Sequence, residues 1–340
     1  MVKFGKAGRH RKQTVTDTRT VRAIEASDTD ELIRIVDGHC KARDWDALVA
    51  LRGRCHEAVT RGKQLWGVDE HVRYRLALEA PAKWAGAVVS EGRTRFTPGP
   101  LPEVAASTKS WAEMASFLEP GPERMTFAAE RIVRGDNPGE PGSLPGLQEW
   151  EPEYPLATYK ADKVETPRPK LPTGETVALP DEVTIIDDPE SEAALTDLIE
   201  PWIDQSNGRC QTVSVEGGAL DAIAALGLPS AGIIPLDTAT ALAHMAWAAA
   251  SGGAHGQRRG AAAGRYLAWW VVAAISDLDW PAPPEEIEKA ASRIRWFWFD
   301  DSSPTGGWEL RLALEDPEMN LGWAISANDI ADQETVISTE

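Results

Sequence analysis

A glycine- and arginine-rich segment, residues 251–265, contains side chains that readily bind an anion. Its cationic and titratable members are His255, Arg258, Arg259 and Arg265. Glycines before a helix leave backbone N–H groups at its positive end, where phosphates and carboxylates bind. Arginine donates paired hydrogen bonds to those groups, and a neighbouring histidine can transfer a proton. These residues form a candidate anion site, although the Gly-Lys-Ser/Thr of a phosphate-binding loop is missing and no strand directly precedes the segment.

The glycines of the same segment favour a structural role. Gly256, Gly260 and Gly264 are four residues apart, so a helix over residues 256–275 would carry them as a bare stripe on one face. The helix expected before it, over residues 238–250, is rich in alanine. Each glycine costs a helix about 1 kcal/mol relative to alanine, which close packing of the two helices would offset. Such a pair could still present the arginines at its open end, so the two roles are compatible.

Other groups of residues are weaker candidates for chemistry. Two cysteines and two histidines of the first predicted helical hairpin have the ligand types of a zinc site: His39, Cys40, Cys55 and His56. Neighbours on a helix point roughly 100° apart, so a rigid hairpin cannot easily aim all four at one ion. We expect buried cysteines and exposed histidines, and we predict no metal and no cofactor. No motif identifies a nucleophile or an acid–base pair, so catalytic residues stay unknown.

Charge and cysteine content limit the partners and the compartment. The chain carries 53 acidic and 35 basic residues, a formal net charge of −18, which disfavours nucleic acid and anionic lipid. Residues 1–22 are the exception, with seven basic residues and one acidic residue, so a weak contact with nucleic acid through this tail is retained. The sequence contains no apolar run of about 18 residues, so we predict no membrane-spanning helix. Three cysteines are too few for a disulfide framework and predict a cytoplasmic protein.

Composition divides the chain into five parts. We expect a basic flexible tail, a helical-hairpin domain, a proline-rich extended linker, an α+β domain and a C-terminal tail, over residues 1–27, 28–135, 136–182, 183–330 and 331–340. The linker contains nine of the 24 prolines of the chain. Each proline removes a backbone donor and fixes φ, so no helix is expected there. The aromatic residues of the linker predict that it lies along a domain surface.

The predicted fold class is α+β, rich in helix. Apolar residues at helical spacing between residues 28 and 134 predict hairpins stacked like a short α-solenoid. In the C-terminal domain we expect helices beside a small antiparallel sheet, whose strands include residues 294–299, 308–315 and 323–325. The first of these strands has aromatic residues on both faces, which predicts a place at the centre of the sheet.

Several stretches in both halves of the chain resemble an uncharacterised family of actinobacterial proteins. The residues that carry the resemblance are 74–81 (YRLALEAP), 101–108 (LPEVAAST), 129–135 (AERIVRG), 251–265 and 306–313 (GGWELRLA). The resemblance implies a bacterial, intracellular setting. It implies no reaction, and no functional residue is carried over from it.

Taken together, these patterns favour a non-catalytic cytosolic binding or adaptor protein that has a protein partner. The reasons are the amphipathic helices, the acidic composition and the lack of a recognisable catalytic constellation. The alternative is an enzyme or sensor for an anionic small molecule, phosphorylated or carboxylated, at residues 251–265. Contact with nucleic acid through residues 1–22 is a third and weaker hypothesis.

Overall fold

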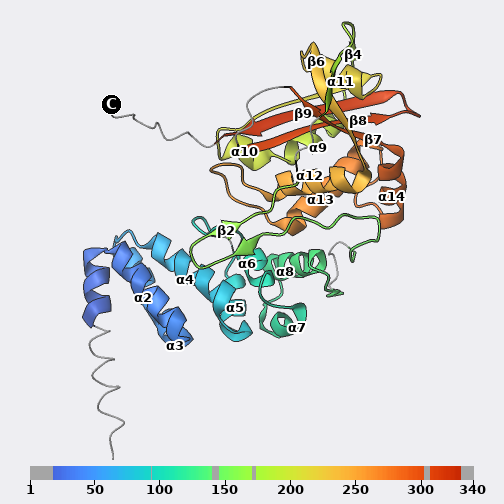
Figure 1. The fold of residues 1–340 in the computed structure, drawn as a ribbon. Coiled ribbons are helices and arrows are strands. Elements are labelled where there is room, and N and C mark those ends of the chain that lie inside the picture. Colours follow the sequence, from blue (N-terminus) through green and yellow to red (C-terminus); the bar gives the residue numbers. More distant parts are fainter. Residues whose placement is uncertain (1–17, 93, 140–144, 171–173, 302–306, 331–340) are drawn as a thin grey trace, which may run out of the picture. The chain divides into compact units, whose positions relative to one another are not determined.

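The computed structural model describes residues 18–92, 94–139, 145–170, 174–301 and 307–330 (Figure 1). The chain divides into two compact units. The first contains the residues up to Phe127 together with Tyr159–Lys163, and the second contains Ala128–Thr158 and the residues from Val164 onward. The stretch predicted as a linker, 136–182, is thus shared between the units. Most of the predicted flexible tail lies outside the described residues, but residues 18–26 are helical.

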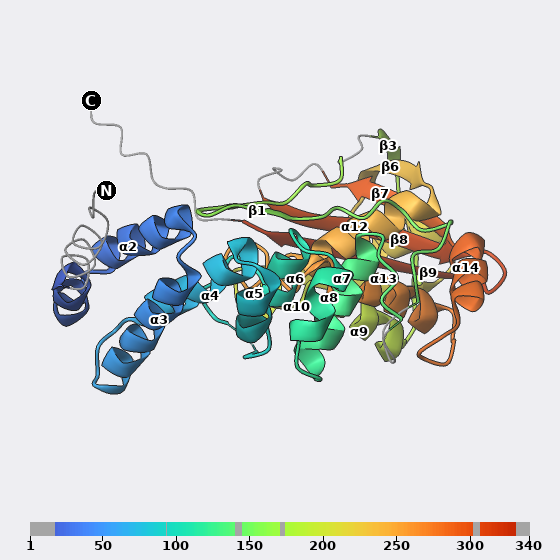
Figure 2. The ribbon, with the colours of Figure 1, turned by 90° about the horizontal axis from the view of Figure 1, so that it is seen from below.

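The first unit is helical. Its elements are α2 (Thr29–Ala42), α3 (Trp45–Thr60), α4 (Trp66–Glu79), α5 (Ala82–Val89), α6 (Leu101–Ala106), α7 (Trp111–Met114), the 3-10 turn η1 (Ala115–Phe117) and the start of α8 (Pro122–Val133). Asp28 and Asp44 cap α2 and α3, because each carboxylate accepts a backbone N–H of the first turn. Consecutive helices pack on one another, and α2 and α3 form a hairpin (Figure 2).

The segment Tyr159–Lys163 returns to this helical unit. The Tyr159 hydroxyl donates to the carboxylate of Glu103, at 2.6 Å, and Glu103 is fully buried in α6. Tyr74 of α4 donates its hydroxyl to the carbonyl of Lys160. Two buried hydroxyl contacts therefore fix this part of the predicted linker to α4 and α6.

The second unit contains a seven-stranded antiparallel sheet, in the order β3-β6-β7-β8-β9-β5-β4. Its strands are β3 (Glu175–Ala178), β4 (Thr184–Ile185), β5 (Arg209–Glu216), β6 (Ser230–Leu236), β7 (Arg295–Asp300), β8 (Trp308–Asp316) and β9 (Leu321–Asp329). The α+β class is confirmed, but the sheet is larger than the small meander that the sequence predicts. A separate two-stranded ladder joins β1 (Thr158–Tyr159) to β2 (Val164–Glu165).

Helices cover both faces of the large sheet (Figure 1). The alternate tryptophans Trp296 and Trp298 of β7 belong to the core with α9 (Pro189–Asp197), α12 (Thr238–Ala250), α13 (Ala261–Ile275) and α14 (Pro284–Arg293). Phe297 and Phe299 pack on the opposite face, against α11 (Ala219–Ala225). The expectation that β7 is central needs correction, because β8 lies at the middle of the order and β7 is its neighbour. Among the described residues, no helix is both long and apolar enough to cross a membrane.

The three glycines at four-residue spacing do not form a helical stripe. Helix α13 begins at Ala261, because Gly260 has φ of 98°, which a helix cannot contain. The backbone N–H of Arg259 donates to the Ala250 carbonyl, so the segment folds back on the end of α12. Gly256 lies in that loop, where it closely approaches the Pro201 carbonyl of α10 (Glu200–Asp204). Only Gly264 lies within α13 and against α12.

Replacing Gly264 by alanine should lower the free energy of unfolding by about 1–3 kcal/mol. The added Cβ would overlap the Ala246 carbonyl oxygen of α12, so the two helices would have to separate. Urea denaturation of the full chain measures the change. Gly38 of α2 is the matched control, because a Cβ there meets nothing within 4 Å. Gly38→Ala should raise stability by about 1 kcal/mol, and equal effects at both glycines would refute the close approach.

Candidate functional site

The start of α13, where the sequence suggests a bound anion, already holds a carboxylate of the protein. Glu130 of α8 accepts the backbone N–H of Ala262 at 2.8 Å, and it is fully buried. Arg134, which directly follows the last residue of α8, forms an ion pair with the same carboxylate. Glu130 therefore supplies the negative charge that a helix start attracts.

Two of the predicted anion-binding arginines are bound to protein groups. Arg259 donates to the carbonyl oxygens of Leu198 and Ala249, both at 2.9 Å, and so holds the end of α12 against the end of α9. Arg265 is buried in α13 and pairs with Glu151 through contacts of 2.6 and 2.7 Å. The structure thus directs these guanidinium groups to different partners rather than to one ligand.

The other two predicted residues lie in the loop itself. Arg258 is half-buried and makes contacts within the chain, whereas His255 is exposed and its backbone N–H donates to the Ser206 hydroxyl. The four residues do not converge on one place, since Arg259 and Arg265 are held by different elements. These four residues therefore do not form one shared binding surface.

The helical unit contains a groove of about 770 Å³. It lies between the α2–α3 turn, the junction of α4 with α5, and the segment that runs from α6 through α7 to η1. Its lining includes Cys40, Arg43, Trp45, Glu79, Pro81, Lys83, Lys109, Glu113 and Phe117. Its wall combines apolar rings with charged groups, as binding sites for peptides do.

Lys109 fixes one wall of the groove. Its ammonium donates to the carbonyls of Ala77 and Leu78, at 2.7 and 3.0 Å, and to the Thr108 hydroxyl at 3.0 Å. The last turn of α4 has no backbone donors left for those carbonyls, so this lysine closes the helix. Burial lowers the pKa of Lys109 to about 8. With three acceptors on three N–H bonds, its role here is structural.

The opposite wall depends on a close approach between α5 and η1. Gly86 of α5 lies against the carbonyl oxygen of Phe117, where any Cβ would overlap it. Phe117 itself is 45% exposed, so its ring remains available at the edge of the groove. Glycine at position 86 therefore brings an exposed aromatic ring beside the start of α5.

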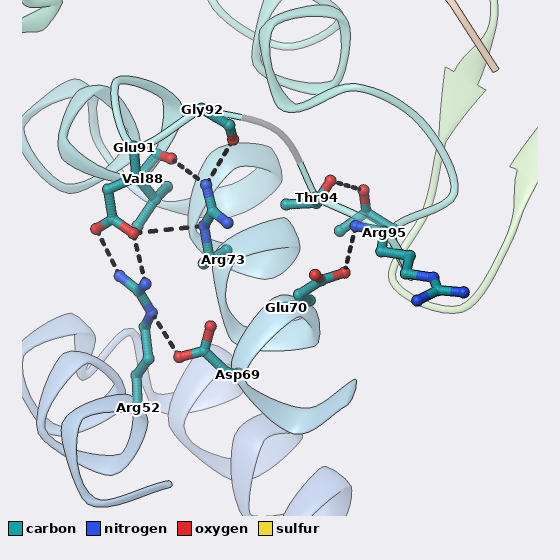
Figure 3. A network of polar contacts seen from close by, with 10 residues as sticks. Arg52, Asp69, Glu70, Arg73, Val88, Glu91, Gly92, Thr94 and Arg95 are labelled. Carbon is teal, nitrogen blue, oxygen red and sulfur yellow. Dashed lines mark hydrogen bonds and ion pairs between the residues drawn. The ribbon is translucent and has the colours of Figure 1, made fainter. Parts of the chain in front are cut away.

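A network of charged side chains links the three helices α3, α4 and α5 (Figure 3). Glu91, just after α5, accepts two hydrogen bonds from Arg52 of α3, at 2.6 and 2.5 Å, and lies 3.5 Å from Arg73 of α4. Arg52 also donates to Asp69 at 3.0 Å, and Arg73 donates to the Gly92 carbonyl at 2.7 Å. One carboxylate thus links two arginines on neighbouring helices, which keeps the walls of the groove in place.

The charges of the groove are unevenly engaged. Glu79 pairs with Arg75, and Glu113 accepts the backbone N–H of Ser110 at 2.8 Å in a capping box. Among the described residues, the side chain of Arg43 has neither a hydrogen bond nor an ion pair, and the ammonium of Lys83 contacts only the ring of Trp84. The groove therefore offers two cations to a partner, while the carboxylates of Glu79 and Glu113 already accept hydrogen bonds within the protein.

The cysteine of the groove is not a reactive thiol. Burial raises the pKa of the Cys40 thiol to about 11, so this cysteine is not a thiolate near neutral pH. In the described ranges, no group of three or more His, Cys, Asp or Glu side chains could hold a metal ion.

Sequence patterns missed the groove because Arg43, Lys83 and Lys109 lie at the ends of different helices, where no regular spacing connects them.

Comparison with known proteins places the chain in a family. No curated protein and no solved structure matches the chain. A family model described as "Family of unknown function (DUF6183)" matches residues 30–329, which include most of both units. The chain therefore belongs to this family of unknown function.

Proposed function

We propose that the protein is a non-catalytic binding or adaptor protein of the cytosol, and that its helical unit holds an acidic segment of a partner protein. The observation that carries the proposal is the pair of cations without an acidic partner, Arg43 and Lys83, in a groove whose own acids are engaged. The rings of Trp45, Pro81 and Phe117 supply apolar contacts beside them. An extended acidic peptide with one bulky apolar side chain fits both features.

The distribution of charge supports an acidic partner at this unit. Residues 18–127 carry sixteen acidic and sixteen basic side chains, so their formal charges cancel. Residues 128–340 carry thirty-six acidic and fourteen basic side chains, so the negative charge of the chain lies there. Salt screens charges beyond about 8–10 Å, so a peptide in the groove responds mainly to the local cations.

Selection of short random peptides against the full chain tests the proposal. Acidic sequences with an aromatic or aliphatic residue should be enriched. The double variant Arg43→Glu/Lys83→Glu should bind the selected peptides at least about tenfold more weakly, measured by fluorescence anisotropy, because two attractions become repulsions. Both side chains are exposed, so the variant should fold normally.

A matched control separates local from overall charge. Arg34 and Lys41 are exposed cations of α2 that do not line the groove. The double variant Arg34→Glu/Lys41→Glu changes the net charge equally and should keep the affinity within about twofold. Enrichment of basic or neutral peptides, or equal losses in the two double variants, would overturn the proposed function.

A further inference from the structure

Three aromatic rings at the surface of the second unit are in contact with one another. Tyr266 and Trp270 lie one turn apart on α13, and Trp280 belongs to the connection from α13 to α14 (Figure 1). The ring centroids of Tyr266 and Trp280 are 5.1 Å apart in an edge-to-face geometry, and those of Trp270 and Trp280 are 5.6 Å apart. The Trp280 indole donates to the Tyr266 hydroxyl at 2.7 Å, which fixes these two rings relative to each other.

This aromatic surface is open to solvent but rests on the core. Tyr266 is 42% exposed, and Trp270 and Trp280 are half-buried. The two tryptophans also pack against the core that α12 and α13 form with the sheet. Because the core holds their rings in place, a partner that covers them orders few side chains on binding. The Tyr266 hydroxyl accepts from Trp280, so its own proton can donate to a carbonyl of a bound segment.

The chain beside these rings is acidic. Residues 276–288 contain five acidic and no basic side chains, and Lys289 follows as a single basic residue. In the part of the chain that the structure describes, all five carboxylates are exposed and have neither a hydrogen bond nor an ion pair: Asp277, Asp279, Glu285, Glu286 and Glu288. The C-terminal end of α13, which favours cations, lies next to the same stretch.

Sequence neighbours and helix packing keep the carboxylates close to the rings. Asp279 directly precedes Trp280, and Glu285 and Glu286 lie in the first turn of α14. Helix α14 packs against α13, which carries the other two rings. Aromatic faces and negative charge therefore belong to one surface of the second unit, the unit that also carries the negative charge of the chain.

This combination selects a cationic partner. A guanidinium or ammonium group is attracted to the face of a Trp or Tyr ring. An acidic segment would be repelled by the five carboxylates, and an apolar one would remove them from water without compensation. Arginine fits better than lysine, because its planar group can stack on a ring and donate two hydrogen bonds to a carboxylate. We propose that Tyr266, Trp270 and Trp280, with the carboxylates of residues 277–288, bind an arginine-containing segment of a partner protein.

Fluorescence anisotropy with labelled peptides on the full chain tests this surface. The probes are three eight-residue peptides in which glycine alternates with arginine, with lysine or with glutamate. The arginine peptide should bind at least about threefold more tightly than the lysine peptide, although their charges are equal, and the glutamate peptide should not bind. Tyr266→Ala removes the most exposed ring and should weaken binding of the arginine peptide about fivefold. Phe96→Ala removes an exposed ring of the first unit and should leave the affinity unchanged.

The carboxylates are tested by a pair of double variants. Asp277→Asn/Asp279→Asn should weaken binding of the arginine peptide at least about fivefold. Asparagine tolerates the left-handed φ of 51° at position 277, so this variant should fold normally. Asp181→Asn/Glu182→Gln changes the net charge equally at two exposed residues between β3 and β4, and should keep the affinity within about twofold. Urea unfolding of every variant should be cooperative.

Four outcomes would overturn the assignment. Failure of the arginine peptide to bind would remove the site, and equal affinities for the arginine and lysine peptides would remove the role of the rings. Equal losses in the two double variants would show that only the overall charge matters. A dimer of the wild-type chain that Tyr266→Ala dissociates, measured by sedimentation, would assign the surface to a second copy instead.

Discussion

Replacing Glu151 by alanine should lower the free energy of unfolding by about 3–5 kcal/mol, because it leaves the Arg265 guanidinium buried without its counter-ion. Both side chains are 1% exposed, so water cannot replace the lost carboxylate. The Glu151 carboxylate also accepts the Tyr154 hydroxyl at 2.6 Å and the indole N–H of Trp269 at 3.1 Å. One substitution therefore leaves several buried donors without a partner.

Urea denaturation of the full chain measures this loss, and Glu149→Ala is its matched control. Glu149 lies two residues earlier on the same segment but is exposed, so its removal should change stability by less than about 0.5 kcal/mol. The double variant Glu151→Leu/Arg265→Met should be closer to wild type than Glu151→Ala, because no charge is left buried alone. A loss below about 1 kcal/mol for Glu151→Ala would show that Arg265 finds another partner.

This pair also shows what sequence patterns can and cannot predict. The tryptophan and tyrosine of the proline-rich stretch indicate that it packs on a surface, and Trp150 does stack on Trp269 with centroids 5.4 Å apart. The sequence does not reveal that Glu151 takes Arg265 away from an anion site, because the two residues are 114 positions apart. Arginine near a helix start is compatible with a ligand or with a distant carboxylate, and only the fold decides between them.

Local sequence signals, such as helix-capping residues, predict the structure better than the spacing of residues over a long stretch. The capping residues Asp28, Asp44 and Ser110 lie at the helix starts that their residue types predict. Strand β6 was not predicted, because Gly232 and Pro235 weaken a strand and only its pairing with β3 and β7 stabilises it. The prediction of a glycine stripe was wrong because it placed all three glycines on one helix, whereas α13 begins at Ala261.

The groove residues illustrate the same limit. Arg43 directly follows α2, Lys83 lies in the first turn of α5 and Phe117 ends η1, so no pattern along the chain relates the three residues. What relates them is tertiary packing, above all the contact of Gly86 with η1 and the links from Glu91 to α3 and α4. The presence of these helices can thus be inferred from composition and capping residues. The surface that we propose as functional depends instead on how the helices pack against one another.

Lowering the pH from 7 to 4 should remove about 3 kcal/mol of stability through His244 alone. Burial, together with the nearby Arg168, lowers the pKa of His244 from its ordinary 6.5 to about 4, and a hydrogen bond to the backbone of Lys170 offsets this in part. The unfolded chain therefore takes up a proton on this histidine below pH 6.5, while the folded chain does not until about pH 4. Stability from this group is complete above pH 6.5 and declines as the pH falls towards 4.

The variant His244→Asn isolates this contribution, because its side-chain amide can still donate to the Lys170 backbone but does not titrate. The free energy of unfolding, obtained from urea denaturation between pH 7 and 4, should fall by about 3 kcal/mol less for the variant than for the wild-type chain. His56→Asn alters an exposed histidine of α3 and should follow the wild-type curve. Parallel curves for His244→Asn and the wild type would mean that the folded protein accommodates a charged His244, and the packing of its ring 4.9 Å from Trp298 would then have to open in acid.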